Sequence, residues 1–219
     1  MEKKFYKYIL FLFFLSIFGF YSILAKELPL SKKVIYIDPG HGGIDPGSIY
    51  KDIYEKDINL DICLKLKDKL EKMGATVYMT REGDYDLSKP GTSQRKKSDL
   101  NNRVRAINDS NADMYISIHL NATNSKKWHG AQVFYDDVNE ENKKIALIMQ
   151  KVLQKNLNTD REISEISNML LNRKVTVPGI LIEVGFLSND NERYLLRQEE
   201  YQNKVADTIT NGIIMYFDN

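Results

Sequence analysis

Two of the three histidines in this chain stand where apolar runs end, a placement typical of side chains that do chemistry at the edge of a sheet. His119 directly follows the run 114–118, and His41 follows the run 34–37 after a short Asp-Pro-Gly turn. Glu183 directly follows a third apolar run, Ile-Leu-Ile. A carboxylate buried beside isoleucine and valine is costly unless it is paired or bound to a cation, so Glu183 is a candidate functional residue.

Two imidazoles with carboxylates are the ligand set of a catalytic zinc site, in which three protein groups bind and a water takes the fourth position. Nitrogen and oxygen ligands without thiolate favour zinc over iron–sulfur clusters or copper(I). Glu55, Asp57 and Glu183 are each candidates for the carboxylate ligand, and the residues alone leave that choice open. The third histidine, His129, follows Trp128 and is interpreted as a surface or substrate-groove residue.

The elements that must position these side chains alternate between strands and helices. Apolar runs predict strands at residues 34–37, 75–80, 113–120, 131–135 and 179–184. Helical periodicity predicts helices at about residues 54–73, 92–108, 139–157 and 199–216. This alternation predicts an α/β fold, a three-layer sandwich with a mostly parallel central sheet flanked by helices. Ligands of such sheets bind outside the carboxyl ends of the strands, so His41, His119 and Glu183 are expected to converge there.

Local signals predict where some of these elements end. Gly74 is expected to end the first helix in a left-handed conformation. Thr92 or Ser93 is expected to cap the second helix. The segment 161–174 has no clear period, and a short strand is expected near residues 169–171.

The first 25 residues differ from the rest of the chain. Three lysines precede an uncharged apolar stretch over residues 8–25, which is the pattern of a secretory signal peptide or of an uncleaved membrane anchor. Either reading predicts that the remaining chain is exported. We therefore expect a leader at 1–25, a short lead-in at 26–33 and one catalytic domain at 34–219.

The charge balance and the cysteine count exclude several classes of protein. Lys and Arg total 31 and Asp and Glu total 30, so the formal charge is +1. The sequence also has no basic stripe of the kind that binds nucleic acid. Cys63 is the single cysteine, which excludes an internal disulfide. It falls within a helical pattern and is expected to pack in the core.

Several motifs together resemble a known family. They are IDPGHGGIDPG at 37–47, EKDINL at 55–60, MTREGD at 79–84, SIHLNA at 117–122 and VPGILIEVGFLSN at 177–189. In this order they resemble the zinc-dependent N-acetylmuramoyl-L-alanine amidases of the Amidase_3 type, over nearly all of the chain from about residue 34 to residue 217. The ordered set is far more specific than any one motif.

The resemblance implies a role for each matched residue. His41, Glu55 and His119 are implied as the zinc ligands, and Glu183 as the catalytic glutamate rather than a ligand. The implied reaction is hydrolysis of the amide between the lactyl group of N-acetylmuramic acid and L-alanine, with peptidoglycan as the substrate. Several members of the family are switched on by other proteins, so an activating protein partner is an expectation as well.

The layout of a leader followed directly by one catalytic domain resembles the germination-type amidases of spore-forming bacteria. That resemblance implies a role in the spore cortex, where removal of stem peptides allows muramic-δ-lactam to form, on the outer face of the membrane or in the forespore envelope. Two alternatives stay open from the sequence. One is an exported zinc peptidase that acts within the stem peptide, and the other is a non-catalytic wall-binding activator.

Overall fold

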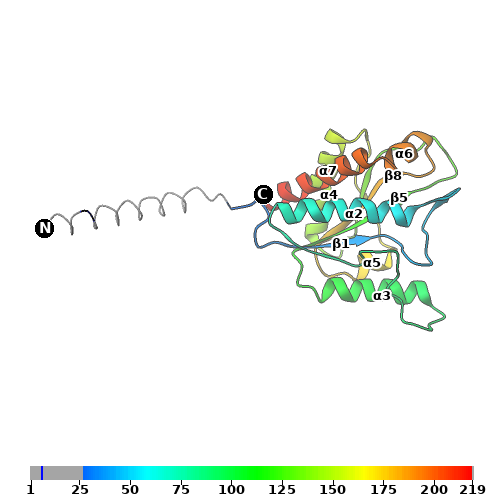
Figure 1. Ribbon diagram of the computed structural model, residues 1–219, viewed down its shortest axis with the longest axis horizontal. Helices are drawn as coiled ribbons and strands as arrows, with labels where there is room; N and C mark the ends of the chain where they lie inside the picture. The colour runs from blue at the N-terminus through cyan, green and yellow to red at the C-terminus, as the bar shows by residue number, and fades with distance from the viewer. Residues whose placement is uncertain (1–5, 7–26, 219) are drawn as a thin grey trace.

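The computed structural model describes Tyr6 and residues 27–218, and in this part of the chain a six-stranded sheet lies between two layers of helices (Figure 1). The strands of the sheet are β1 (Val34–Pro39), β4 (Thr76–Met79), β5 (Met114–Asn121), β6 (Gln132–Tyr135), β7 (Ser164–Glu165) and β8 (Gly179–Phe186). Their spatial order is β4-β1-β5-β8-β6-β7, and every neighbouring pair is parallel except β6 with β8. The predicted α/β sandwich with a mostly parallel sheet is confirmed.

The helices divide between the two faces of the sheet. One face is covered by α2 (Glu55–Lys72), α4 (Glu140–Asn156) and α7 (Glu199–Phe217), and α7 contacts both of the other two helices. The opposite face carries α3 (Arg95–Asn108) and the short α5 (Leu170–Lys174), as Figure 1 shows. The last short helix, α6 (Asp190–Leu196), follows β8 and packs against α7. A separate hairpin, β2 (Ile49–Tyr50) with β3 (Ile53–Tyr54), precedes α2.

The main core lies between the sheet and the layer of α2, α4 and α7. The inner face of α2 carries Ile62, Leu66 and Leu70, which are fully buried. Fully burying such a side chain stabilises a fold by about 1.5–3 kcal/mol. Cys63 is also buried, as its helical pattern predicts. A smaller apolar cluster on the other face joins α3 to α5. The central strands are therefore packed on both faces of the sheet.

Of the two predicted helix ends, one is confirmed and the other is wrong. Gly74 has a φ of +96°, so the left-handed end of the first helix is confirmed. The predicted cap of the second helix is wrong, because α3 begins at Arg95 after Gln94. The Thr92 hydroxyl instead accepts a hydrogen bond from the Gln94 backbone N–H at 3.2 Å, which forms a turn just before the helix.

The strand expected near residues 169–171 is also wrong. Residues 170–174 form α5, whose Leu171 is buried in the small cluster with side chains of α3. The extension of the sheet comes earlier, where β7 pairs in parallel with β6. An apolar triplet such as Met-Leu-Leu suits a strand or one turn of helix equally, and packing against α3 decides for the helix.

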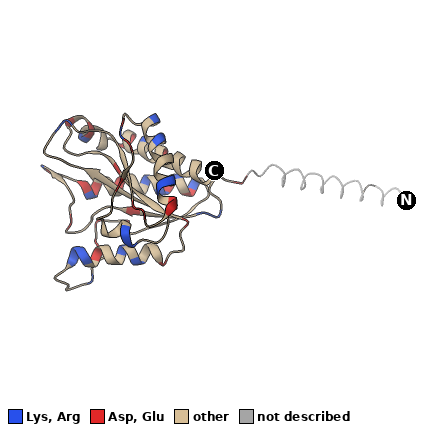
Figure 2. Cartoon of the chain, turned by 180° about the vertical axis from the view of Figure 1, so that it is seen from behind, with Lys and Arg blue, Asp and Glu red and all other residues tan. Residues whose placement is uncertain are grey.

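The predicted leader at 1–25 lies outside the described residues, apart from Tyr6. Within the described residues, no helix has the length and hydropathy needed to cross a membrane. The domain boundaries stay a prediction. Lys and Arg are interspersed with Asp and Glu over the described elements (Figure 2), in line with the near-neutral charge of the chain.

Candidate metal centre and catalytic cleft

The three strands that carry the predicted site residues are neighbours, so their carboxyl ends meet. β5 lies between β1 and β8, and His119 of β5 is the register partner of Glu183 of β8. His41 follows β1 in the turn after Pro39. The convergence of His41, His119 and Glu183 that the sequence predicts is therefore confirmed.

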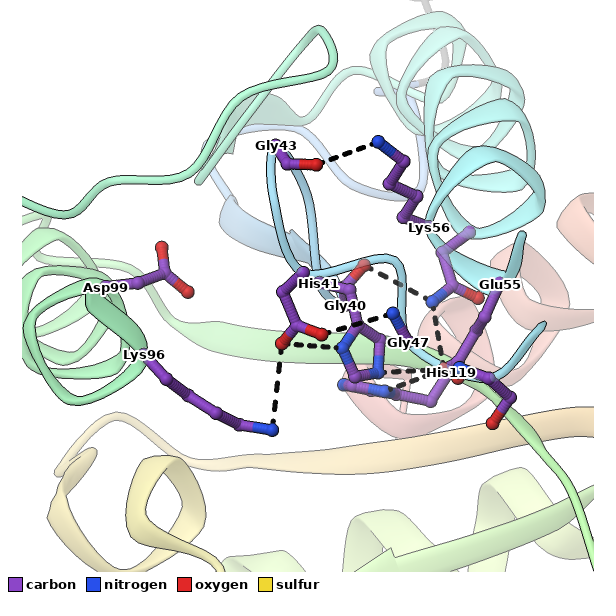
Figure 3. Close-up of polar contacts among 12 residues, drawn as sticks. Gly40, His41, Gly43, Gly47, Glu55, Lys56, Lys96, Asp99 and His119 are labelled. Carbon is purple, nitrogen blue, oxygen red and sulfur yellow. Dashed lines mark hydrogen bonds and ion pairs between the residues drawn. The ribbon is translucent and has the colours of Figure 1, made fainter. Parts of the chain in front are cut away.

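A compact cluster of donor atoms forms at this edge. The Glu55 Oε1 atom lies 3.2 Å from His41 Nε2 and 3.1 Å from His119 Nδ1 (Figure 3). Ligand atoms of these three residues all lie within 4.8 Å of one another. Two imidazole nitrogens and one carboxylate oxygen match the donor set of a catalytic zinc site with one open position. The residues present therefore fit a metal ion of this type.

The geometry separates the carboxylates that the sequence left open. Glu55 is the first residue of α2, and 3% of its surface is exposed. Asp57 is exposed to solvent, and it lies outside the donor cluster, as does His129. Among these candidates, Glu55 is the carboxylate that sits between the two imidazoles.

Glu55 is held in place through both of its carboxylate oxygens. Oε2 accepts a hydrogen bond from the Ser48 backbone N–H at 2.9 Å, and Oε1 accepts one from the Leu120 backbone N–H at 3.0 Å. Burial raises the pKa of Glu55, but its hydrogen bonds with His119 and His41 outweigh burial and keep that pKa well below its usual range. The carboxylate is therefore ionised and aimed at the imidazoles before any ligand binds.

Asp45 is a member of the site that the sequence analysis missed. Its Oδ2 atom lies 3.1 Å from His41 Nδ1, on the side of the ring opposite the Glu55 contact. A metal-binding histidine usually donates its second N–H to a carboxylate, which fixes the tautomer and the ring orientation. Asp45 is in the position to do this for His41. The repeated Asp-Pro-Gly sequence was the available signal, because it places a second Asp close to the histidine.

The turn that carries His41 is strained and is clamped by two buried arginines. His41 has a φ of +62°, a region that side chains other than glycine rarely adopt. Arg103 donates to the His41 carbonyl at 2.6 Å and to the Pro39 carbonyl at 2.8 Å. Arg81 donates to the Gly40 carbonyl at 2.9 Å and to the Pro39 carbonyl at 3.1 Å. Three consecutive carbonyls are thus fixed by guanidinium groups, which stabilises the conformation that presents the imidazole.

Two aspartates balance the charge of Arg103 inside the protein. Arg103 contacts Asp38 at 2.7 Å and Asp99 at 2.9 Å. Burial raises the pKa of Asp38, but Arg103 and hydrogen bonds from Thr80 and Ser117 outweigh burial and lower it to about 2. The buried pair is therefore ionised at neutral pH. It connects the end of β1 to α3, beside the turn that carries His41.

Glu183 is the one carboxyl of the site with an unsatisfied atom. Its side chain is partly exposed to the cleft, but Oε2 is buried and finds no hydrogen-bond partner among the described residues. Burial raises the pKa of Glu183 to about 7; the charge of His119 lowers it, and that of Glu55 raises it. A carboxyl with such a pKa gains and loses a proton readily near neutral pH, as a general base and acid requires.

Two connected clefts meet at the donor cluster. One, of about 380 Å³, is lined by Glu183, His119, Glu55 and the segment 120–122. The other, of about 340 Å³, runs between α3 and α5 and is lined by apolar side chains such as Leu100 and Leu171. Both clefts reach His41, His119, Asp45, Lys96 and Met169. A substrate can therefore extend from the cluster in two directions.

Comparison with known proteins places this chain in a family. Residues 35–215 match the family model described as N-acetylmuramoyl-L-alanine amidase. The chain is 51% identical over 195 residues to the germination-specific N-acetylmuramoyl-L-alanine amidase of Bacillus subtilis, which covers 87% of this chain and 82% of that protein. It is 31% identical to the amidase LytC of the same organism, over 89% of this chain and 38% of LytC.

Solved structures agree with these sequence matches. The fold is similar to that of the CwlD amidase from Clostridioides difficile, solved in complex with the GerS lipoprotein, with a TM-score of 0.82 and 41% identity. That match covers 85% of this chain and 99% of CwlD. The catalytic domain of the amidase CwlV from Bacillus (Paenibacillus) polymyxa matches with a TM-score of 0.75 and 34% identity, over 85% of this chain and 98% of that one.

Proposed function

Because this chain belongs to the family of N-acetylmuramoyl-L-alanine amidases, we propose that it hydrolyses the amide bond between the lactyl group of N-acetylmuramic acid and the L-alanine of the stem peptide. One observation carries this proposal: the His41, Glu55 and His119 donor atoms cluster within 4.8 Å, and Glu183 lines the same cleft. This arrangement provides a place for a metal ion and a separate carboxyl for proton transfer.

In this proposal the metal is zinc, and His41, Glu55 and His119 hold it. The chemistry that bound zinc supplies is a water with a pKa lowered toward ~7 and a polarised substrate carbonyl. Asp45 keeps the His41 ring in the tautomer whose Nε2 lone pair faces the cluster. The arginine clamp keeps the same ring in place from the backbone side.

Glu183 is the proposed general base and acid. It takes a proton from the attacking water and delivers it to the departing amine of L-alanine. Its pKa of about 7 and its unpaired Oε2 atom support this role, because both leave the carboxyl free to exchange a proton. A carboxylate committed to ligation or to a salt bridge would be far less basic.

The biological setting follows from the substrate. Peptidoglycan lies outside the cytoplasmic membrane, so we propose that residues 1–25 export the chain, as a cleaved signal peptide or as an anchor on the outer face. The name and the 51% identity of the germination-specific relative from Bacillus subtilis support action in the spore cortex. Removal of the stem peptide there is the step that allows muramic-δ-lactam to form.

A protein partner is part of the proposal. The similar CwlD amidase was solved in complex with a lipoprotein, which supports an activating partner on the outer face of the membrane for this chain. Activity measured with the chain alone and then with added candidate partners tests this part. Full activity of the chain alone would remove the need for a partner.

The reaction itself is tested by digesting purified peptidoglycan and identifying the new ends by mass spectrometry. An amidase releases stem peptides with a free L-alanine amino terminus and leaves intact N-acetylmuramic acid. A chelator is expected to abolish release, and added zinc to restore it. New ends within the stem peptide, or release that a chelator does not affect, would contradict the proposal.

A further inference from the structure

Lys96 stands where the two clefts of the site meet. It lies on the first turn of α3, and its side chain reaches toward the cluster (Figure 3). It lines both the cleft of about 380 Å³ and the cleft of about 340 Å³. Neighbouring Lys97 is exposed and lines neither cleft. The first residues of α3 are basic (Figure 2), but Lys96 is the lysine among them that lines the clefts.

Of the two basic side chains that line these clefts, Lys96 is the one whose charged group still has N–H donors available. Among the described residues that line them, the other cation is Arg103, whose guanidinium is taken up by Asp38, Asp99 and backbone carbonyls. Lys96 has a long contact of 3.7 Å to Asp45, and its own side chain is 73% exposed. Such a contact contributes little, and the ammonium has donors left for a second acceptor.

The charged side chains around Lys96 in the cleft that contains Glu183 are carboxylates, so Lys96 is the basic side chain there that can pair with a carboxylate of the substrate. Asp45, Glu55 and Glu183 line the cleft of about 380 Å³ beside Lys96. The glycan of peptidoglycan is uncharged once the lactyl group is in an amide, so its negative charge lies in the stem peptide. The nearest carboxylate to the scissile bond belongs to the D-glutamate that follows L-alanine.

We propose that Lys96 binds the α-carboxylate of this D-glutamate and so makes the enzyme selective for stem peptides in which that group is not amidated. The inference rests on the proposed amidase function and adds the direction of the substrate. The peptide lies over α3, where Lys96 and the largely apolar cleft between α3 and α5 receive it. The glycan then lies along the other cleft, beside Glu183 and residues 120–122.

The test compares two substrates with three proteins. The substrates are glycan strands whose stem peptides carry D-glutamate or its α-amide, D-isoglutamine. The proteins are the wild type, Lys96→Gln and the matched control Lys97→Gln, each supplied with zinc. The measured quantity is the ratio of kcat/KM for the two substrates, which a general loss of activity does not change.

The wild type and Lys97→Gln are expected to prefer the carboxylate substrate roughly tenfold, as one charged hydrogen bond provides. Lys96→Gln is expected to bring the ratio close to one. An equal loss on both substrates would overturn the proposal, because it would mean that Lys96 acts through Asp45 and His41. A wild type without preference would also overturn it. Cleavage of neither substrate, even with candidate partners added, would instead refute the amidase function itself.

A binding measurement keeps the inference testable if turnover needs a partner. Isothermal titration calorimetry with the dipeptides L-Ala-D-Glu and L-Ala-D-isoglutamine reports recognition without catalysis. Tighter binding of the acid by the wild type and equal binding by Lys96→Gln support the proposal. Equal binding of the two dipeptides by the wild type would refute it.

Discussion

His119 and Glu183 are register partners on the neighbouring parallel strands β5 and β8. Paired residues on adjacent strands project to the same face of a sheet, so the imidazole and the carboxyl reach the same cleft. Glu55 draws the imidazole into the donor cluster at 3.1 Å, whereas Glu183 keeps a buried oxygen without a partner. This difference is the structural basis for assigning metal binding to one glutamate and proton transfer to the other.

The first prediction concerns Asp45. Asp45→Asn is expected to weaken zinc binding about 10–100-fold, because the amide no longer fixes His41 through a charged hydrogen bond. Competition with a chromophoric chelator measures the affinity. Asp57→Asn is the matched control, since Asp57 is an exposed carboxylate outside the cluster. Equal zinc affinity of the Asp45 variant and the wild type would show that Asp45 does not orient the ligand.

The second prediction concerns the arginine clamp. Arg103→Met is expected to destabilise the fold by about 3–5 kcal/mol, because it leaves Asp38 buried without its counter-ion. Urea unfolding monitored by circular dichroism measures the loss. Arg105→Met, two residues along α3 and exposed, is the control and is expected to change stability by less than about 0.5 kcal/mol. Similar effects of the two changes would contradict the role of the clamp.

The third prediction is a pH dependence of stability. The pKa of Asp38 falls from 3.8 to about 2 in the folded protein, so its ionised form stabilises the fold above pH 3.8. That contribution, about 2 kcal/mol, is lost as the pH falls from about 4 through 2. In Asp38→Asn the free energy of unfolding is expected to fall less steeply over this window. Parallel curves for the two proteins would contradict the assignment.

The sequence predicted the convergence of the strands because apolar runs and the polar groups at their ends are local features. It did not predict the clamp, since Arg81 and Arg103 contact the His41 turn from 41 and 62 residues away. No spacing rule connects such positions. The environment of Glu183 was predicted from its apolar neighbours, whereas its unpaired oxygen depends on packing that only the fold defines.

The errors have a related cause. Residues 169–171 were assigned to a strand from their apolar character, but Leu171 packs with side chains of α3, which lies more than 60 residues earlier in the chain. The start of α3 was placed at Thr92 or Ser93 because such residues often cap helices. In the structure the Thr92 hydroxyl accepts a hydrogen bond within a turn, and the helix begins later, at Arg95. Short segments and element ends are decided by tertiary contacts, so local preference is a weak guide to them.

His41, Glu55 and His119 are proposed to hold the metal, and Glu183 is proposed to transfer the proton without binding the metal. Glu183→Gln preserves the size of the side chain but removes the group that exchanges a proton. One experiment measures zinc content and the rate of stem-peptide release on the same preparation of this variant. We predict one equivalent of zinc and a rate lowered about 10²–10⁴-fold. Loss of zinc, or release at the wild-type rate, would contradict the account.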